Sequence, residues 1–313
     1  MLWYTIRRLA TTVPTLVAVL TVIFIIIRIA PGDPAIAVLG DNATQQSIEA
    51  MRERLGLNQP LGAQYWSFLS SALTGDLGKS LVSGRSVLGE VLAVLPHTLD
   101  LTFASILVGI VLGLPIGILA AVYRNGAIDY IARILSLLGL SFPAFYTAIL
   151  LILAFAIHHP WFPVMSNPKL GDPVDRLYNL VLPAFSLGLI MVAYVARTAR
   201  SSMIAALGGD FIRTARAKGA PARIVVLRHG LRNAIIPVIT VIGLYLGLLI
   251  GNSVITEIVF NRPGLGKLIV GALEQRDYTM LQGLMVIYAF FIVLTNLLTD
   301  LAYGLSDPRV KYQ

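Results

Sequence analysis

Residues 99–122 read LDLTFASILVGIVLGLPIGILAAV, with one charged side chain, Asp100, near the start. The hydrocarbon core of a bilayer is about 30 Å thick, and a helix needs roughly 20 apolar residues to cross it. This stretch is therefore predicted to be a membrane-spanning helix. Five further stretches are candidates of the same kind: Leu9–Ile29, Ile134–Ile157, Leu180–Val195, Ile235–Val254 and Leu284–Tyr303. We predict an all-α polytopic membrane protein with six spans.

Prolines occur inside or at the ends of several of these spans, at Pro14, Pro115, Pro143, Pro183 and Pro237. Neighbouring helices in a membrane bundle can satisfy the carbonyls that a proline leaves free, so the prolines do not exclude the spans. The fourth span is the shortest and needs flanking residues, starting near Leu177.

The composition of the whole chain agrees with a membrane protein. Of the 313 residues, 57% are hydrophobic and 13% are charged, and the mean hydropathy is +0.79. A soluble domain is about 45–50% apolar and about 25% charged. The net charge of +8 fits an excess of basic residues on the cytosolic side better than nucleic-acid binding. With no cysteine, disulfides and thiolate metal sites are excluded.

The amino-terminal segment has the charge order of a signal peptide, with Arg7 and Arg8 before an apolar run. That run, Leu9–Ile29, is longer than the roughly 7–15 residues of a signal h-region. We expect an uncleaved first span.

The distribution of Lys and Arg predicts the orientation. The 197–232 loop contains eight basic residues and one acid, Asp210, whereas the basic residues on the other side are nearly matched by acids. The positive-inside rule places this loop and both termini in the cytosol. The remaining basic residues of that side are Arg7, Arg8, Arg124, Arg133, Arg309 and Lys311.

Four segments follow from this topology. Residues 1–30 form the amino-terminal segment and first span, and residues 31–97 an extracytoplasmic segment of short helices, such as Gln45–Arg54 and Gln64–Leu73, between Gly and Pro breakers. Residues 98–304 form the transmembrane core, with a cytosolic loop at 197–233, and residues 305–313 a cytosolic tail.

Glycines recur at helical spacing in two spans. Gly109, Gly113 and Gly117 lie on one face of the second span, and Gly243, Gly247 and Gly251 on one face of the fifth. Small residues at this spacing favour close helix packing in lipid. For the fifth span, an alternative is that the glycine face slides along a translocation pathway.

The basic loop contains a short helix between breakers. Asp210 is suited to the N-cap and Gly219 to the C′ position, and Pro221 prevents continuation. A helix of about two turns is not stable alone in water. We therefore expect it to pack against something.

Several motifs together resemble a known family. Arg213-Thr214-Ala215-Arg216-Ala217-Lys218-Gly219, followed by Arg228-His229-Gly230-Leu231-Arg232-Asn233-Ala234, is similar to the "EAA" loop of ABC importer permeases. The resemblance is to the B-type permease of dipeptide, oligopeptide, glutathione and nickel importers. It extends over nearly the whole chain, through Pro31-Gly32-Asp33-Pro34, Leu55-Gly56-Leu57, Gly75-Asp76-Leu77-Gly78, Thr198-Ala199-Arg200, Pro263-Gly264-Leu265-Gly266, Arg276-Asp277-Tyr278 and Asp307-Pro308-Arg309.

The resemblance implies a type I ABC importer permease fold in a bacterial or archaeal cytoplasmic membrane. It implies a second homologous permease subunit, two cytosolic ATPase subunits that hold ATP and Mg, and an extracytoplasmic binding protein. The short helix would dock in a groove of an ATPase subunit. The residues assigned to this docking are Asp210, Phe211, Arg213, Thr214, Ala215, Arg216, Lys218 and Gly219. The chain departs from the wider ABC pattern at Arg213, where that pattern has Glu.

A second candidate site follows the fifth span. Glu257, Pro263, Gly264 and Gly266 form a stretch suited to an external gate or to contact with the binding protein. Asp100 and Asp300, near helix ends, are expected to be interhelical or boundary groups.

Two other motifs carry no site in this interpretation. Gly78-Lys79-Ser80 resembles the end of a P-loop, but Leu73 occupies the position of the required glycine. His158 and His159 are adjacent, so they do not share a helix face, and no carboxylate is near them. We predict no metal site, no cofactor and no catalytic site in this chain.

Two other functional classes compete with the permease. A secondary transporter driven by ion gradients tends to carry ionisable residues at mid-membrane, which these spans lack. An intramembrane enzyme would need a motif such as His-Glu-x-x-His, and none occurs. Small peptides are the expected cargo, with glutathione, nickel chelates and oligosaccharides as alternatives.

Overall fold

The computed structural model describes residues 2–29, 33–39 and 43–306. Throughout these residues the chain forms helices and no strand. The motif residues Pro31, Gly32 and 307–309, together with Lys311, lie outside the described part. The helices are α1 (Leu2–Ile29), α2 (Pro34–Leu39), α3 (Gln45–Arg54), α4 (Leu61–Thr74), α5 (Val87–Val122), α6 (Ala127–Ser141), α7 (Ala144–Ile152), α8 (Pro173–Tyr178), α9 (Val181–Leu207), α10 (Asp210–Ala217), α11 (Ala222–Ile224), α12 (Leu231–Val259), α13 (Leu265–Glu274) and α14 (Tyr278–Ser306), with π-helical turns η1 (Leu153–His158) and η2 (Val225–Gly230).

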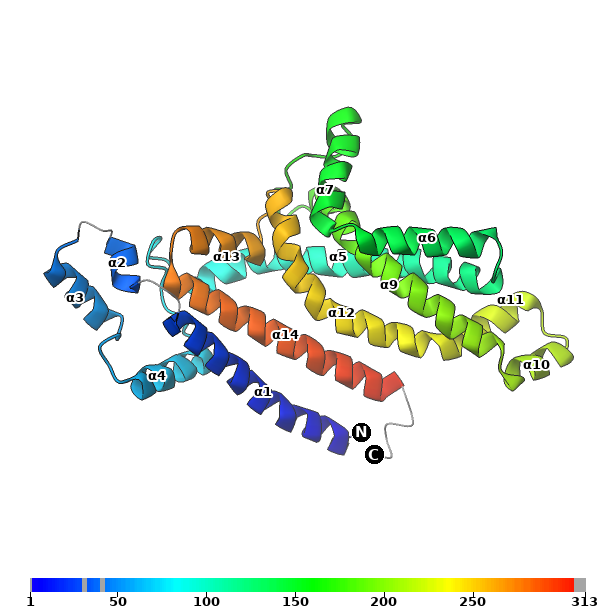
Figure 1. Ribbon diagram of the computed structural model, residues 1–313, viewed down its shortest axis with the longest axis horizontal. Helices are drawn as coiled ribbons and strands as arrows, with labels where there is room; N and C mark the ends of the chain where they lie inside the picture. The colour runs from blue at the N-terminus through cyan, green and yellow to red at the C-terminus, as the bar shows by residue number, and fades with distance from the viewer. Residues whose placement is uncertain (1, 30–32, 40–42, 307–313) are drawn as a thin grey trace.

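Five helices in the described residues, α1, α5, α9, α12 and α14, are long and apolar enough to cross a membrane. They run side by side along the long axis of the molecule, with α1 antiparallel to α14 (Figure 1). Five of the six predicted spans are thereby confirmed as single helices. The fourth begins at Val181, close to the predicted start, and the second begins earlier than predicted, at Val87.

The third predicted span, Ile134–Ile157, is wrong as a single helix. It divides into α6 and α7 with η1, which are bent by 100° relative to each other, and α7 projects away from the bundle (Figure 1). Pro143 is the physical reason, because its ring crowds the preceding residue and favours extended over helical backbone there. Phe142 accordingly adopts φ −92° and ψ 125°. Pro14, Pro115 and Pro237, by contrast, lie within continuous helices.

The predicted close packing along Gly109, Gly113 and Gly117 is confirmed. A Cβ added at Gly113 would lie 2.7 Å from the Val192 carbonyl oxygen, and one at Gly117 2.5 Å from that of Ala196. The backbones of α5 and α9 therefore approach as closely as small residues allow. The largest buried apolar cluster surrounds this contact and reaches α12 through Val238 and Leu249.

The second glycine series behaves differently along its length. A Cβ at Gly243 would lie 2.1 Å from Cγ2 of Thr299 on α14, whereas Gly247 and Gly251 have no atom within 4 Å of that position. Within this chain, close packing holds only at Gly243.

The segment predicted to be extracytoplasmic packs on the ends of α1 and α14, as expected. The predicted helix Gln45–Arg54 is α3, and Gln64–Leu73 lies within α4. Phe24 of α1 contacts Tyr65 and Phe68 of α4, and Arg28 donates a 2.8 Å hydrogen bond to Gln64. Helices α2 to α4 form the end of the molecule opposite α10 (Figure 1).

The tight α5–α9 contact generates a testable prediction. Replacing Gly113 with alanine places a Cβ against the α9 backbone, so α5 must shift, and such overpacking costs roughly 1–3 kcal/mol. We expect a lower apparent melting temperature of the purified protein in detergent. Gly62→Ala in α4 is the matched control, because no atom lies within 4 Å of its Cβ position. Equal melting temperatures for the two variants would contradict the packing described.

Candidate functional site

The short helix of the basic loop is α10, preceded by a cap that differs from the prediction. Gly209, with φ −74° and ψ 154°, occupies the N-cap, and Asp210 is the first helical residue. Asp210 as N-cap is therefore wrong. The extended backbone that an N-cap needs falls at Gly209, and Asp210 instead places its charge in the first turn, where the helix dipole favours an acid.

The end of α10 is confirmed as predicted. Gly219 has φ +76°, which is the left-handed region that glycine enters without steric cost. The amide of Gly219 bonds to the carbonyl of Arg216, and the amide of Ala220 to that of Ala215, at 2.9 and 3.1 Å. This pair of bonds is a Schellman motif, which ends the helix by satisfying carbonyls that would otherwise be free.

One face of α10 is held by the chain and the other is open. Ile212 and Ala215 are buried against Val225 of η2. The remaining residues assigned to docking, from Asp210 to Gly219, are exposed, and the side chains of Asp210 and Arg213 keep 93% and 80% of their surface. We call residues 210–219 the docking helix.

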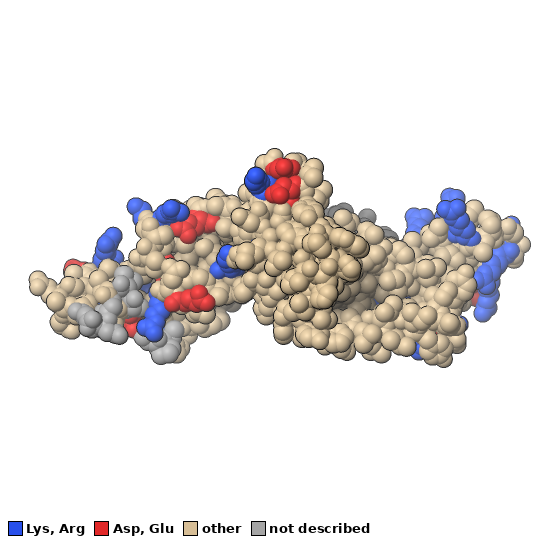
Figure 2. Space-filling model, turned by 90° about the horizontal axis from the view of Figure 1, so that it is seen from above, with Lys and Arg blue, Asp and Glu red and all other residues tan. Residues whose placement is uncertain are grey.

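Charge divides the molecule along its long axis. Figure 2 shows basic side chains gathered at the end where α10 and α11 lie, and acidic and basic side chains mixed at the opposite end. The docking helix contributes Arg213, Arg216 and Lys218 to the basic end, all exposed. This surface is suited to a partner with acidic groups.

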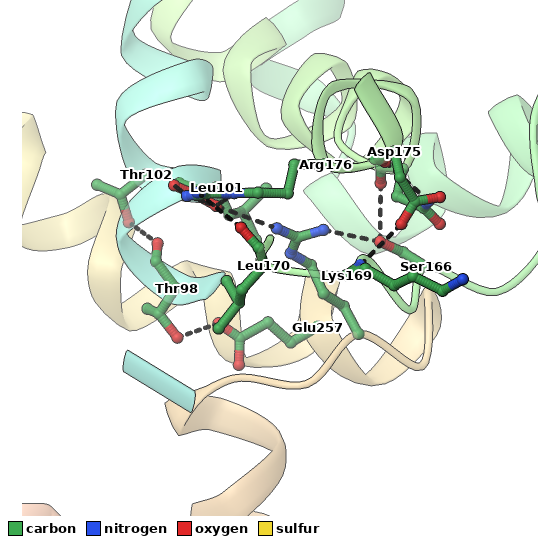
Figure 3. A network of polar contacts seen from close by, with 12 residues as sticks. Thr98, Leu101, Thr102, Ser166, Lys169, Leu170, Asp175, Arg176 and Glu257 are labelled. Carbon is green, nitrogen blue, oxygen red and sulfur yellow. Dashed lines mark hydrogen bonds and ion pairs between the residues drawn. The ribbon is translucent and has the colours of Figure 1, made fainter. Parts of the chain in front are cut away.

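The external candidate residues form a buried cap on α13. Glu257, at the end of α12, is fully buried and its carboxylate accepts hydrogen bonds from the amides of Gly266 and Lys267 at 2.7 and 3.3 Å. It also accepts one from the Thr98 hydroxyl at 2.7 Å (Figure 3). Because a carboxylate at a helix N-terminus satisfies free amides, Glu257 joins α5, α12 and α13.

The two glycines beside the Glu257 carboxylate leave room that a larger residue would fill. A Cβ at Gly264 would lie 2.3 Å from the Glu257 carboxyl carbon, and one at Gly266 2.4 Å from Cα of Val254. Gly264 and Gly266 are buried, and Pro263 is partly exposed. The structure thus brings the four predicted residues together, but Glu257 has no exposed surface to offer a binding protein in this conformation. Their role as a gate stays a prediction.

An ion-pair network lies next to this cap. Arg176 of α8 donates bidentate hydrogen bonds to Asp100 of α5, two of them at 2.7 Å, and Arg262 is fully buried, with Nη1 donating to Ser166 at 2.8 Å. Burial lowers the pKa of the Arg262 guanidinium to about 10, so it stays charged at neutral pH. The expected interhelical role of Asp100 is confirmed, as is that of Asp300, which pairs with Arg8 at 2.6 Å.

At the basic end, a second buried carboxylate joins α6 to α9. Asp129 is fully buried and accepts hydrogen bonds from Nε and Nη2 of Arg200, at 2.5 and 2.8 Å. Its Oδ2 also accepts one from the amide of Asn125 at 2.9 Å.

Sequence reasoning missed the buried carboxylates. It left Asp129 out, placed Glu257 in an external gate or a binding-protein contact, and used Asp277 only as part of a motif. Asp277 is buried and accepts from the Ser80 hydroxyl at 2.5 Å and the Met280 amide at 3.0 Å. An Asp directly before a long apolar helix was the available signal for this N-cap.

The motifs set aside from sequence have structural roles. Ser80 of the Gly78-Lys79-Ser80 motif donates a hydrogen bond from its hydroxyl to the carboxylate of Asp277. The surrounding loop is closed by a β-bridge between Lys79 and Ser86. His158 bonds to the carbonyl of Leu153. In the part of the chain that the structure describes, no three His, Asp or Glu side chains gather as a metal site would need.

Comparison with known proteins decides the family. Residues 113–312 match the model "Binding-protein-dependent transport system inner membrane component", and residues 1–102 match the N-terminal model of the same membrane component. The chain belongs to this family. It is a multi-pass permease subunit of an ABC importer, a class that works with ATPase subunits and a binding protein.

Relatives of this permease agree over its full length. It is 41% identical to "Glutathione transport system permease protein GsiC" of Escherichia coli (strain K12) and 42% identical to the GsiC protein of Pectobacterium atrosepticum, over 313 residues and 100% of each chain. Its fold is similar to solved structures of the inward-facing MetNI methionine ABC transporter (TM-score 0.57, 19% identity, 69% of this chain and 96% of that one) and of an amino acid ABC transporter with histidines (0.54, 18%, 69% and 93%).

The Glu257 cap can be tested by removing its charge. Glu257→Gln replaces one of the two accepting carboxylate oxygens with an NH2 group, so either the Thr98 hydroxyl or the amides of Gly266 and Lys267 lose their acceptor. Leaving such buried groups unpaired costs about 1–3 kcal/mol. We expect a lower apparent melting temperature in detergent. Glu274→Gln, an exposed position at the end of α13, should leave it unchanged. A Glu257→Gln variant as stable as this control would rule out the capping role.

The left-handed position at the end of the docking helix gives a second test. Gly219→Val forces a β-branched residue to φ +76°, a conformation that already costs an ordinary side chain roughly 1–2 kcal/mol. We expect normal membrane insertion, loss of ATP-driven uptake and reduced co-purification of the ATPase subunit. Gly208→Ala in the same loop, at φ −83°, is the control. Normal uptake with normal ATPase co-purification in Gly219→Val would contradict docking through this helix.

Proposed function

We propose that this permease imports glutathione or peptides of similar size across a bacterial cytoplasmic membrane. The observation that carries the cargo is the full-length identity of 41–42% to glutathione permeases. The family description, an inner membrane component, supports the membrane. A binding protein would deliver the cargo to the end of the molecule formed by α2 to α4, α8 and α13.

The docking helix is the proposed contact to an ATPase subunit. Two observations support this contact. The helix starts and ends at defined capping residues, and Ile212 and Ala215 pack against the chain on one face while the other face is exposed. The wider ABC pattern has Glu where this chain has Arg213. Basic side chains facing acidic residues at the rim of the ATPase groove would therefore set the position of the helix. ATP and Mg would reside on the ATPase subunits, and this chain would perform no catalysis.

The division of charge supports the orientation. With the basic end in the cytosol, as the positive-inside rule favours, the docking helix faces the ATPase subunits. The start of α1 and the end of α14 also point toward that side (Figure 1).

A second, homologous permease is the proposed partner of the open α12 face. Gly247 and Gly251 have free space around them, and Leu244, Leu248 and Ile255 expose 60, 57 and 50% of their surface. A glycine face flanked by apolar side chains permits close approach of another helix. The translocation pathway would lie between the two subunits and open alternately to either side.

A cavity beside the external cap supports contact with the binding protein. It has a volume of about 530 Å³ and is lined by Pro263, Gly264 and Lys267, together with Arg85 and Glu90. Pro263 and Gly264 thus line this cavity, whereas Glu257 does not.

Reconstituted uptake tests the cargo and the energy source together. Proteoliposomes would hold the complete transporter, with labelled glutathione, a dipeptide and a nickel chelate offered through the binding protein. We expect ATP-dependent uptake of glutathione, and competition by small peptides. Uptake restricted to the dipeptide or the nickel chelate would contradict glutathione as the cargo. Uptake driven by an ion gradient without ATP would overturn the mechanism.

A further inference from the structure

A cavity of about 470 Å³ lies between α5, α6 and α9 near the basic end, apart from the docking helix and the glycine face of α12. Its lining includes Arg133, Arg197 and Arg200 together with Ile116, Leu137 and Leu140. Helices α5 and α6 meet at this end of the molecule (Figure 1). Nothing in the proposed import mechanism uses this cavity.

The cavity has an excess of positive charge. Asp129 is the one acid that pairs with its arginines in the described residues, and its two strong hydrogen bonds go to Arg200. Arg133 lies 3.5 Å from the same carboxylate, and Arg197 has no ion pair or hydrogen bond in the described part of the chain. The cavity therefore has three guanidinium groups in its lining and one carboxylate beside two of them, which leaves two positive charges without a matching acid.

Polarity changes with depth along the wall formed by α6. This helix starts at the basic end, so Tyr130 and Arg133 lie nearer that end than Leu137 and Leu140. The Arg133 guanidinium stacks on the Tyr130 ring, 4.4 Å from its centroid. Tyrosine and arginine are typical of the membrane–water interface, where their polar tips reach the headgroups. The leucines are exposed or half-buried toward the middle of the membrane.

We propose that this cavity binds one anionic phospholipid. The phosphodiester would accept hydrogen bonds from Arg133 and Arg197, and the acyl chains would lie along Leu137 and Leu140. Arg200 is held by Asp129 and keeps the wall in place. Basic pockets between spanning helices bind anionic headgroups in this manner. A free phosphate would use the same arginines, but it would leave the apolar wall uncovered, so the lipid is the ligand that fits the whole cavity.

Native mass spectrometry of the complete transporter tests this inference. The purified complex is mixed with detergent micelles that contain phosphatidylglycerol or phosphatidylcholine, and the retained lipid is measured as a function of concentration. Inorganic phosphate is the third probe. We expect saturable retention of about one phosphatidylglycerol per copy of this chain and weak retention of phosphatidylcholine.

Three variants locate the binding. Each arginine near an anionic surface contributes about fivefold in affinity, so Arg133→Gln with Arg197→Gln should weaken phosphatidylglycerol binding by about 25-fold. Ser136→Phe, which fills the cavity and keeps all charges, should also weaken phosphatidylglycerol retention. Arg124→Gln is the matched control, since Arg124 is exposed at the same end but outside the cavity.

The outcomes separate the possibilities. Unchanged phosphatidylglycerol retention in the double variant or in Ser136→Phe would overturn the site, as would equal retention of phosphatidylcholine by the unaltered protein. Displacement of the lipid by millimolar inorganic phosphate would overturn the proposal that the ligand is a lipid and would favour a free anion. Absence of retained lipid in the complete transporter would mean that a partner subunit fills the cavity, and would also overturn it. None of these outcomes bears on the cargo.

Discussion

The close approach of α5 to α9 through Gly109, Gly113 and Gly117 is the contact on which the remaining structure depends. Lipid supplies no hydrophobic force between helices, so their association relies on van der Waals packing, which is largest where backbones come nearest. This contact centres the main buried cluster, which also holds α12. The docking helix follows directly from the end of α9. The packing of one helix pair therefore sets where the docking helix lies.

Helix α12 connects the two ends of the molecule. It begins at η2, on which the docking helix packs, and ends at Glu257, which caps α13 and binds Thr98 of α5. With a rise of about 1.5 Å per residue, its 29 residues span roughly 43 Å. The docking helix and the cap of α13 are thus connected by one continuous helix. Buried carboxylates near the two ends of the molecule, Glu257 and Asp129, join neighbouring helices through hydrogen bonds.

The site was predictable where a local rule governs it. Gly219 and Pro221 mark the end of the docking helix because a left-handed backbone and a missing amide are properties of single residues. The start was predicted one residue too late, at Asp210, because Gly209 and Asp210 are both acceptable caps and the extended backbone at Gly209 depends on how α9 ends. Likewise, Pro143 was visible in the third span, but Pro115 and Pro237 lie in continuous helices, so sequence could not tell which proline breaks its helix.

By itself, the sequence determined the membrane class, the number of apolar segments, the division of charge between the ends and the family, since each depends on residue type and order along the chain. Tertiary structure alone decided which glycines meet a neighbour, that Glu257 is a buried cap rather than an open contact, and that Asp129 pairs with Arg200. These outcomes depend on groups far apart in the chain, such as Thr98 and Glu257. A single sequence records no distance between such groups, and their contact arises only when the helices pack.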